Sequence, residues 1–244
     1  MVKTDMSRHT HEHVEHSRSR HSTEVKRDTA KLRERATSRG IVVGTSGTRW
    51  QVIDVHHQEA EHGVFTNIKE CIPGGVVMSN NDDDTLLCVG DVVRYAELDQ
   101  NHNDEESVGV IVEVEKRSSR LLRKTAGERT HLQCLASNVE LCCIVQSAAE
   151  PFYNKRLIDR YIVSIEHGGM KPIIIINKIE LMDKDFVSED LQCYRDLGIP
   201  VILSSCVTGE GLDSIRTLFA HTTSMMAGPS GVGKSSIINA CFGM

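Results

Sequence analysis

The chain has 244 residues, of which 39% are hydrophobic and 25% charged, and its formal net charge is −6. This composition is typical of a globular protein with one large domain or two small ones. No apolar run approaches the roughly 20 residues that span a bilayer, and the N-terminus lacks the apolar segment of a secretory signal. We therefore exclude a membrane protein and expect a cytoplasmic one. Its eight cysteines contain no C-x-x-C pair and should stay reduced.

The charge is spread unevenly along the chain. Residues 1–40 contain ten Lys and Arg against six Asp and Glu, residues 40–115 contain three against fifteen, and residues 116–129 contain six against one. Basic stretches in an acidic chain suggest contact with a polyanion, although solvated segments explain them equally well. Residues 1–39 have almost no large apolar side chains, which predicts a disordered basic tail.

Short alternating segments follow the tail. Val, Ile and Thr recur between Gly-, Asn- and Asp-rich breaks, which predicts strands over residues 41–43, 49–55, 64–72, 91–98 and 108–114. Five short strands favour a small all-β barrel of the OB type over residues 40–115, and an SH3-like barrel fits the pattern almost as well. Residues 116–137 are then expected to be a basic linker.

From residue 138 to residue 244, strand and helix patterns alternate. Strands are predicted over 139–145, 172–177, 200–205 and 223–227, and helices over 154–167, 188–197, 210–221 and from 234 onward. Residues 173–176 are four consecutive isoleucines, which is typical of a strand buried on both faces of a parallel sheet. The sequence therefore predicts a doubly wound α/β domain with its ligand loops at the carboxyl ends of the strands.

Residues 228–235 read GPSGVGKS and match the phosphate-loop pattern GxxxxGK[ST] in full, between a predicted strand and a predicted helix. The glycines let backbone N–H groups cradle phosphate oxygens, and the start of the helix adds partial positive charge. Lys234 should reach the β and γ phosphates, and Ser235 should hold Mg²⁺. The predicted phosphate-site residues are Gly228, Pro229, Ser230, Gly231, Val232, Gly233, Lys234, Ser235 and Ser236.

Asn177-Lys178-Ile179-Glu180 follows the isoleucine strand and resembles the NKxD guanine-specificity motif of GTPases. A carboxylate there accepts hydrogen bonds from two donors of guanine that adenine does not present together. Glu180 is one methylene longer than the usual Asp, which alters its reach. Ser204-Ser205-Cys206 follows the next strand, in the place of the loop whose backbone N–H contacts guanine O6. A P-loop ATPase or kinase with an incidental NKIE remains an alternative.

Most GTPases carry the phosphate loop first, whereas here the guanine motif precedes it, which indicates a circular permutation of the same sheet. With the preceding barrel and stretches such as Gly90-Asp-Val-Val-Arg94 and Leu157-Ile-Asp-Arg-Tyr-Ile162, residues 40–244 resemble the small ribosomal subunit biogenesis GTPase family (the RsgA or YjeQ type). The resemblance implies a GTPase that binds GTP or GDP with Mg²⁺ and associates with the small ribosomal subunit and its rRNA late in maturation. We expect no membrane association and a monomer.

The family pattern continues beyond what this sequence holds. In the family, the switch segments, the DxxG motif and a zinc-binding domain lie further along than Met244, and the sequence contains no DxxG. We therefore expect an incomplete GTPase domain without zinc ligands, with the water-positioning residue unknown, and expect hydrolysis to be lost before nucleotide binding. An RNA-binding OB module with a catalytically inert nucleotide domain is the alternative.

RNA contact is expected mainly outside the acidic barrel, where only a few residues such as Arg49, Lys69 and Arg94 could serve. The basic linker should instead supply phosphate contacts, with a steep salt dependence. The predicted RNA-binding residues are Lys116, Arg117, Arg120, Arg123, Lys124 and Arg129.

Overall fold

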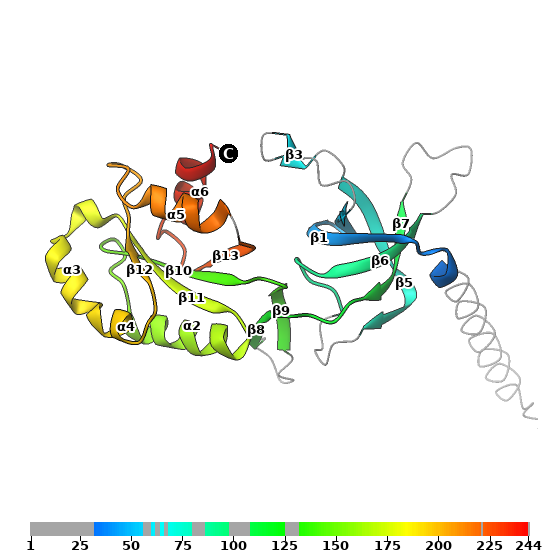
Figure 1. The fold of residues 1–244 in the computed structure, drawn as a ribbon, viewed down its shortest axis with the longest axis horizontal. Helices are drawn as coiled ribbons and strands as arrows, with labels where there is room; N and C mark the ends of the chain where they lie inside the picture. The colour runs from blue at the N-terminus through cyan, green and yellow to red at the C-terminus, as the bar shows by residue number, and fades with distance from the viewer. Residues whose placement is uncertain are drawn as a thin grey trace, which may run out of the picture. The chain divides into compact units, whose positions relative to one another are not determined.

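The computed structural model describes residues 32–55, 60–61, 64–65, 68–79, 86–97, 108–124, 132–220 and 222–243. The chain divides into two compact units, Met1–Arg117 and Ser118–Met244 (Figure 1). No helix of the described residues is long and apolar enough to cross a membrane. Most of the predicted tail lies outside the described residues. Its last part, residues 32–39, is not disordered: residues 32–35 are helical, and Ala36 packs against Ala96 and Val112 of the first unit.

The first unit is a closed five-stranded barrel in the order β1-β2-β5-β7-β6. Its neighbouring strands pair antiparallel except β5 and β7, which are parallel. Alternating apolar side chains, among them Val52, Tyr95 and Ile111, fill the interior. The strands are β1 (Ser38–Ser46), β2 (Arg49–Asp54), β5 (Ile68–Ser79), β6 (Val92–Glu97) and β7 (Gly109–Val114), with a short separate pair β3 (Ala60–Glu61) and β4 (Val64–Phe65).

A buried ion pair fixes the end of the first unit. Arg117 Nε donates to Asp91 Oδ1 at 2.7 Å and its Nη2 donates to Oδ2 at 2.8 Å. The two side chains are 1% and 0% exposed, and the Cys88 backbone N–H also donates to Asp91 at 2.8 Å. The expectation that Arg117 contacts RNA phosphate is therefore wrong, because its charge is neutralised inside the protein.

The second unit begins with a β-hairpin where a linker was expected. Strand β8 (Arg120–Lys124) pairs antiparallel with β9 (Leu132–Ser137). Leu121, Cys134 and Ala136 are buried, and Leu121 and Ala136 join the main core of the unit. The basic residues of this segment thus stand on an ordered hairpin.

A four-stranded sheet of parallel strands in the order β12-β11-β10-β13 forms the centre of the second unit. The two middle strands are apolar on both faces, as the isoleucine run predicts. Ile174 and Ile176 face one core cluster, and Ile173 and Ile175 face the other. The strands are β10 (Leu141–Ser147), β11 (Lys171–Asn177), β12 (Val201–Leu203) and β13 (Ser224–Ala227).

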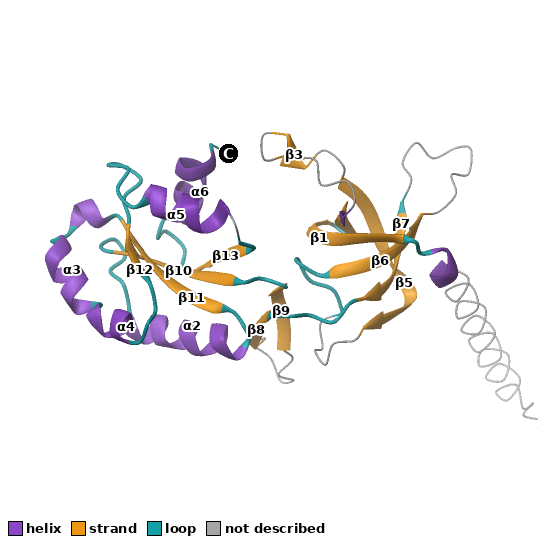
Figure 2. Ribbon diagram, in the orientation of Figure 1, coloured by secondary structure: helices purple, strands orange, loops and turns teal. Residues whose placement is uncertain are grey.

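Helices cover both faces of this sheet (Figure 2). On one face lie α2 (Lys155–His167), α3 (Lys184–Asp190) and α4 (Gln192–Asp196), and on the other α5 (Leu212–Ala220) and α6 (Lys234–Phe242). The single helix expected over 188–197 is instead two short ones. The first begins early because the Asp183 side chain caps it, accepting from the Asp185 and Phe186 N–H groups.

Candidate nucleotide-binding site

Both predicted nucleotide motifs lie at the same edge of the parallel sheet. Residues 228–235 follow β13 and Asn177 ends β11, with β10 between these two strands. Strand β11, which follows β10 in the chain, pairs with one edge of β10, and β13 pairs with the opposite edge of β10. Such a switch in connection direction leaves a crevice at the carboxyl ends of the strands, the usual ligand position in α/β sheets.

The phosphate loop depends on glycine at its two ends. Gly228 has φ +151°, and a Cβ there would lie 2.1 Å from the Val145 carbonyl oxygen, so the loop starts flat against β10. Gly233 has φ +92° and directly precedes α6. No side chain caps the start of α6, so its first backbone N–H groups remain as donors for an anion. This backbone fits a phosphate group.

The side chains of the loop suit the same ligand. Lys234 Nζ donates to the carbonyl oxygens of Gly228 at 2.9 Å and Pro229 at 2.5 Å, which holds the ammonium over the loop. Val232 is buried beside Ile237 and anchors the loop in the core. Ser235 and Ser236 are exposed in the first turn of α6. A hydroxyl at Ser235 is the kind of oxygen ligand that Mg²⁺ accepts beside phosphate oxygens and water.

Asn177 joins the guanine motif to the phosphate loop. Its Nδ2 donates to the Val232 carbonyl oxygen at 3.0 Å, and the Ser204 hydroxyl lies 3.5 Å from its Oδ1. Asn177 is buried, and its amide holds the loop after β11 against the phosphate loop. The backbone of Lys178 is in the left-handed region, with φ +59°. Its Nζ donates to the Glu150 carbonyl oxygen at 2.5 Å.

Glu180 is exposed in a short 3-10 turn, η2 (Ile179–Leu181), beside the loop that follows β12. Burial raises the pKa of the Cys206 thiol, a hydrogen bond with Asn177 opposes this, and the nearby Glu180 carboxylate raises that pKa further. The Ile179 N–H, next to Glu180, donates to the Ser204 carbonyl oxygen at 3.1 Å, so η2 and the 204–206 loop lie together.

Two of the three backbone N–H groups in that loop are engaged within the protein. The Ser204 N–H donates to the Ile176 carbonyl at 2.8 Å, and the Ser205 N–H donates to the Glu210 carbonyl at 3.0 Å. The Ser205 hydroxyl accepts from the N–H groups of Val207 and Thr208. The next backbone N–H, that of Cys206, has no acceptor among the described residues. Of the three residues in the predicted loop, Cys206 is therefore the one whose backbone N–H is left for a ligand, which the sequence does not reveal.

The predicted RNA-binding residues are dispersed. Lys116 and Arg123 are exposed, Arg120 is half-buried, and Arg123 Nη2 donates to Gln133 Oε1 at 2.9 Å across the hairpin. The Lys124 side chain and Arg129 lie outside the described residues. On the barrel, Arg49, Lys69 and Arg94 each pair with a glutamate. Among the described residues, no group of three or more His, Cys, Asp or Glu side chains could hold a metal ion.

A parallel sheet with a phosphate loop and an NKxE loop at one edge defines a P-loop nucleotide-binding domain of the GTPase type. The family model for the RsgA GTPase matches residues 114–243, and the chain belongs to this family. The chain is 36% identical over 170 residues to the small ribosomal subunit biogenesis GTPase RsgA of Chlorobaculum parvum, covering 68% of this chain and 54% of that protein. For RsgA of Gemmatimonas aurantiaca the identity is 31% over 203 residues, with 83% and 62% covered.

Two solved structures have a similar fold. YjeQ from Thermotoga maritima matches with a TM-score of 0.59 and 26% identity, covering 84% of this chain and 64% of that one. YloQ, described as a circularly permuted GTPase, matches with a TM-score of 0.58 and 27% identity over the same shares. The permuted loop order inferred from the sequence is thus shared with these structures. The chain spans about half to three-fifths of the length of the curated relatives, 54% and 62% for the two above.

Proposed function

We propose that this chain binds GTP and GDP at the loop edge of its parallel sheet and, as an RsgA-type GTPase, hydrolyses GTP while assisting late maturation of the small ribosomal subunit. The hydrogen bond from Asn177 Nδ2 to the Val232 carbonyl carries the proposal, because it locks the base-selecting loop onto the phosphate loop. A chance NKIE tetrapeptide in an ATPase or kinase would have no reason to make this contact.

Each site residue has a distinct task in this proposal. The carboxylate of Glu180 accepts from guanine, and the Cys206 N–H, which has no acceptor among the described residues, donates to guanine O6. Lys234 and the start of α6 hold the phosphates and stabilise the charge that phosphoryl transfer spreads over their oxygens. Ser235 would hold Mg²⁺, which neutralises phosphate charge when bound.

We also propose that the barrel is of the OB type and that RNA contact falls to the basic hairpin. The closed order β1-β2-β5-β7-β6 with one parallel pair supports the first point. The ion pairing of Arg49, Lys69 and Arg94 disfavours these barrel cations as phosphate ligands. Lys116, which precedes the hairpin, and Arg120, Arg123, Lys124 and Arg129 remain candidates for rRNA phosphate contacts. The eight free thiols suit a cytoplasmic protein.

Competition for a fluorescent GDP analogue tests the nucleotide assignment. We expect GTP and GDP, but not ATP, to displace the analogue from the whole chain with Mg²⁺ present. Glu180→Ala should remove this preference, at a cost of about 1–3 kcal/mol in guanine affinity, since the donors of the base lose their acceptor. Asp183→Ala, a carboxylate in the same loop that caps α3, serves as control and should retain the preference. Equal competition by ATP and GTP in the unmutated chain would show the guanine assignment to be wrong.

A further inference from the structure

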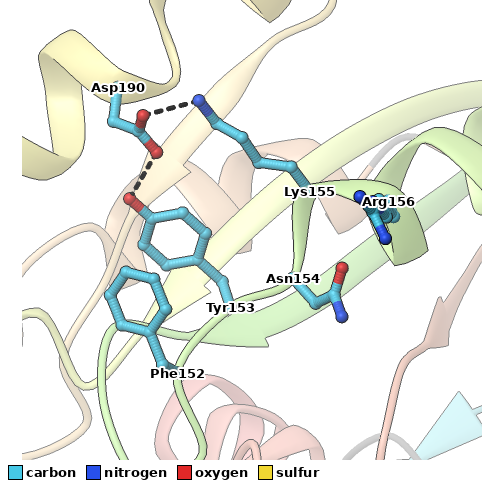
Figure 3. Close-up of a pocket in the computed structure, with 6 residues that line it drawn as sticks. All are labelled: Phe152, Tyr153, Asn154, Lys155, Arg156 and Asp190. Carbon is cyan, nitrogen blue, oxygen red and sulfur yellow. Dashed lines mark hydrogen bonds and ion pairs between the residues drawn. The ribbon is translucent and has the colours of Figure 1, made fainter.

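A shallow hollow opens at the start of α2, on the face of the sheet that α2, α3 and α4 cover (Figure 3). Its volume is about 570 Å³, and it is lined by Phe152, Tyr153, Asn154, Lys155, Arg156 and Asp190. None of these residues belongs to the nucleotide motifs, and the proposed function gives them no task.

Phe152 forms an exposed aromatic platform with a braced underside. Its side chain is 51% exposed, and its ring stacks on that of Tyr153 with centroids 4.2 Å apart. Tyr153 is buried, and its hydroxyl donates to Asp190 Oδ2 at 2.8 Å. Lys155 Nζ donates to the other oxygen of Asp190 at 2.5 Å. An exposed ring that is held rigid in this way suits the stacking of a nucleobase, which requires a π face but no particular base.

Two exposed arginines lie beside this platform. Arg156 and Arg160 lie one turn apart on the exposed side of α2, and neither makes an ion pair among the described residues. Of the nearby carboxylates, Asp190 is paired with Lys155, and Asp159 accepts from the Tyr194 hydroxyl at 2.7 Å but keeps its charge, while Glu150 and Glu189 are exposed. The two arginines beside an exposed ring can hold phosphates, which favours a nucleic acid over a purely apolar partner.

The surface continues toward the basic hairpin. Helix α2 has 13 residues and so runs about 20 Å. At its end, the Gly168 carbonyl accepts from the Arg120 N–H at 2.9 Å, which places β8 beside it (Figure 2). Arg120 and Arg123 thus lie beyond the far end of the same helix.

We propose that Phe152 stacks against an unpaired base of single-stranded RNA and that Arg156 and Arg160 hold the adjoining phosphates. This inference deepens the proposed association with ribosomal RNA and rests on it. Stacking contributes the affinity that is least sensitive to salt, and the two arginines contribute the salt-dependent part.

The test uses the whole chain, a fluorescent 12-nucleotide oligoadenylate and purified small ribosomal subunits. We expect Phe152→Ala to weaken oligoadenylate binding about tenfold. Phe152→Trp should retain binding and show fluorescence quenching by the stacked base. Phe186→Ala serves as matched control, since Phe186 is 54% exposed on α3, outside the hollow, and should leave binding unchanged. Arg156→Gln with Arg160→Gln should lower the slope of log affinity against log salt by about 0.7 per phosphate contact.

Four outcomes would overturn the inference. The first is that the unmutated chain fails to bind oligoadenylate, and the second is that Phe152→Ala binds oligoadenylate as tightly as the unmutated chain. The third is that Phe152→Ala loses GDP affinity. The fourth is that Phe152→Ala binds small subunits more weakly while its oligoadenylate binding is unchanged. The third would place the hollow in the nucleotide site, and the fourth would indicate a ribosomal protein as partner. If Phe152-dependent oligoadenylate binding persists while subunits do not bind, the inference stands and the proposed function fails.

Discussion

Gly233 is the residue at which the two nucleotide loops meet. A Cβ at this position would lie 2.3 Å from Asn177 Nδ2, whereas a Cβ at Gly231, which also has a positive φ, would meet no atom within 4 Å. We expect Gly233→Ala to displace Asn177 from Val232 and to weaken GDP binding at least tenfold. Gly231→Ala introduces only backbone strain, of about 1–2 kcal/mol, and should lose less GDP affinity than Gly233→Ala. Titration of both variants with a fluorescent GDP analogue compares them, and equal losses would contradict the role of this close approach.

Arg117 offers a second test at single residues. Removing one partner of a buried ion pair leaves the other charge uncompensated, which typically costs about 3–5 kcal/mol. We therefore expect Arg117→Ala to destabilise the barrel strongly in urea unfolding, while Lys116→Ala, at an exposed neighbour, changes stability by less than about 0.5 kcal/mol. A double variant, Asp91→Leu with Arg117→Met, should recover much of the loss. A stable Arg117→Ala with weakened RNA binding would restore the phosphate-contact prediction.

Single residues also show what the sequence cannot predict. The phosphate loop and NKIE could be predicted because each motif consists of contiguous residues. The task of Asn177 could not, since it depends on the Val232 carbonyl 55 positions away. Arg117 was assigned to RNA because a run of basic residues does not reveal which of them has a buried carboxylate as partner. The sequence indicates the loop 204–206 but not which of its amides is unengaged, because the acceptors that occupy the Ser204 and Ser205 amides come from β11 and from Glu210.

At the scale of elements, the last turn of α6 is held by α5. Arg216 of α5 donates from Nε to the Cys241 carbonyl at 3.1 Å and from Nη2 to the Ala240 carbonyl at 2.9 Å. A cation on the last carbonyls of a helix stabilises it by about 0.3–1 kcal/mol. We expect Arg216→Ala to speed amide hydrogen exchange in the last turn of α6, measured by mass spectrometry. Thr217→Ala, on the same helix, should leave α6 unchanged, and equal exchange in both variants would contradict the clamp.

Elements with strong periodicity were predictable, and those with charged surfaces were not. The isoleucine strand and α2 follow their apolar patterns closely. The hairpin β8–β9 is hard to distinguish from a linker in the sequence. Strand β8 carries Arg120, Arg123 and Lys124, and Leu121 is the one fully buried residue among its described side chains, so no apolar alternation is visible. Helix α3 buries a single residue, Val187, so it gives no periodic signal, although its cap at Asp183 could have indicated its start.

At the scale of the whole molecule, strand order cannot be deduced from chain order. The sheet places β13, the last strand in sequence, beside β10, the first. Local patterns predict that these strands exist and are buried, but not which neighbours they have, because pairing is decided by tertiary packing. The order of the two motifs indicates a circular permutation, but which strands are neighbours comes from the structure.

The buried cysteines allow the unfolding of each of the two units to be followed separately. Cys71 is buried in the barrel core, whereas Cys142 and Cys143 lie in the central strand β10 of the other unit. Burial raises the pKa of each of these thiols from the ordinary 9.0 to about 12. Because the thiolate is the reactive form, a thiol reagent at pH 8 should modify exposed Cys193 quickly and these three only after unfolding.

The same shifts predict a loss of stability in alkali. Each thiol titrates near 9 in the unfolded chain and near 12 in the folded one, so the unfolded state loses protons first as the pH rises. Stability should be intact below pH 9 and fall between pH 9 and 12, by at most about 1.4 kcal/mol per pH unit for each thiol. Urea unfolding from pH 7 to pH 10.5 measures this, and Cys142→Ala should flatten the decline. Rapid native labelling of Cys71 at pH 8, or a midpoint that does not change with pH, would contradict the burial of these groups.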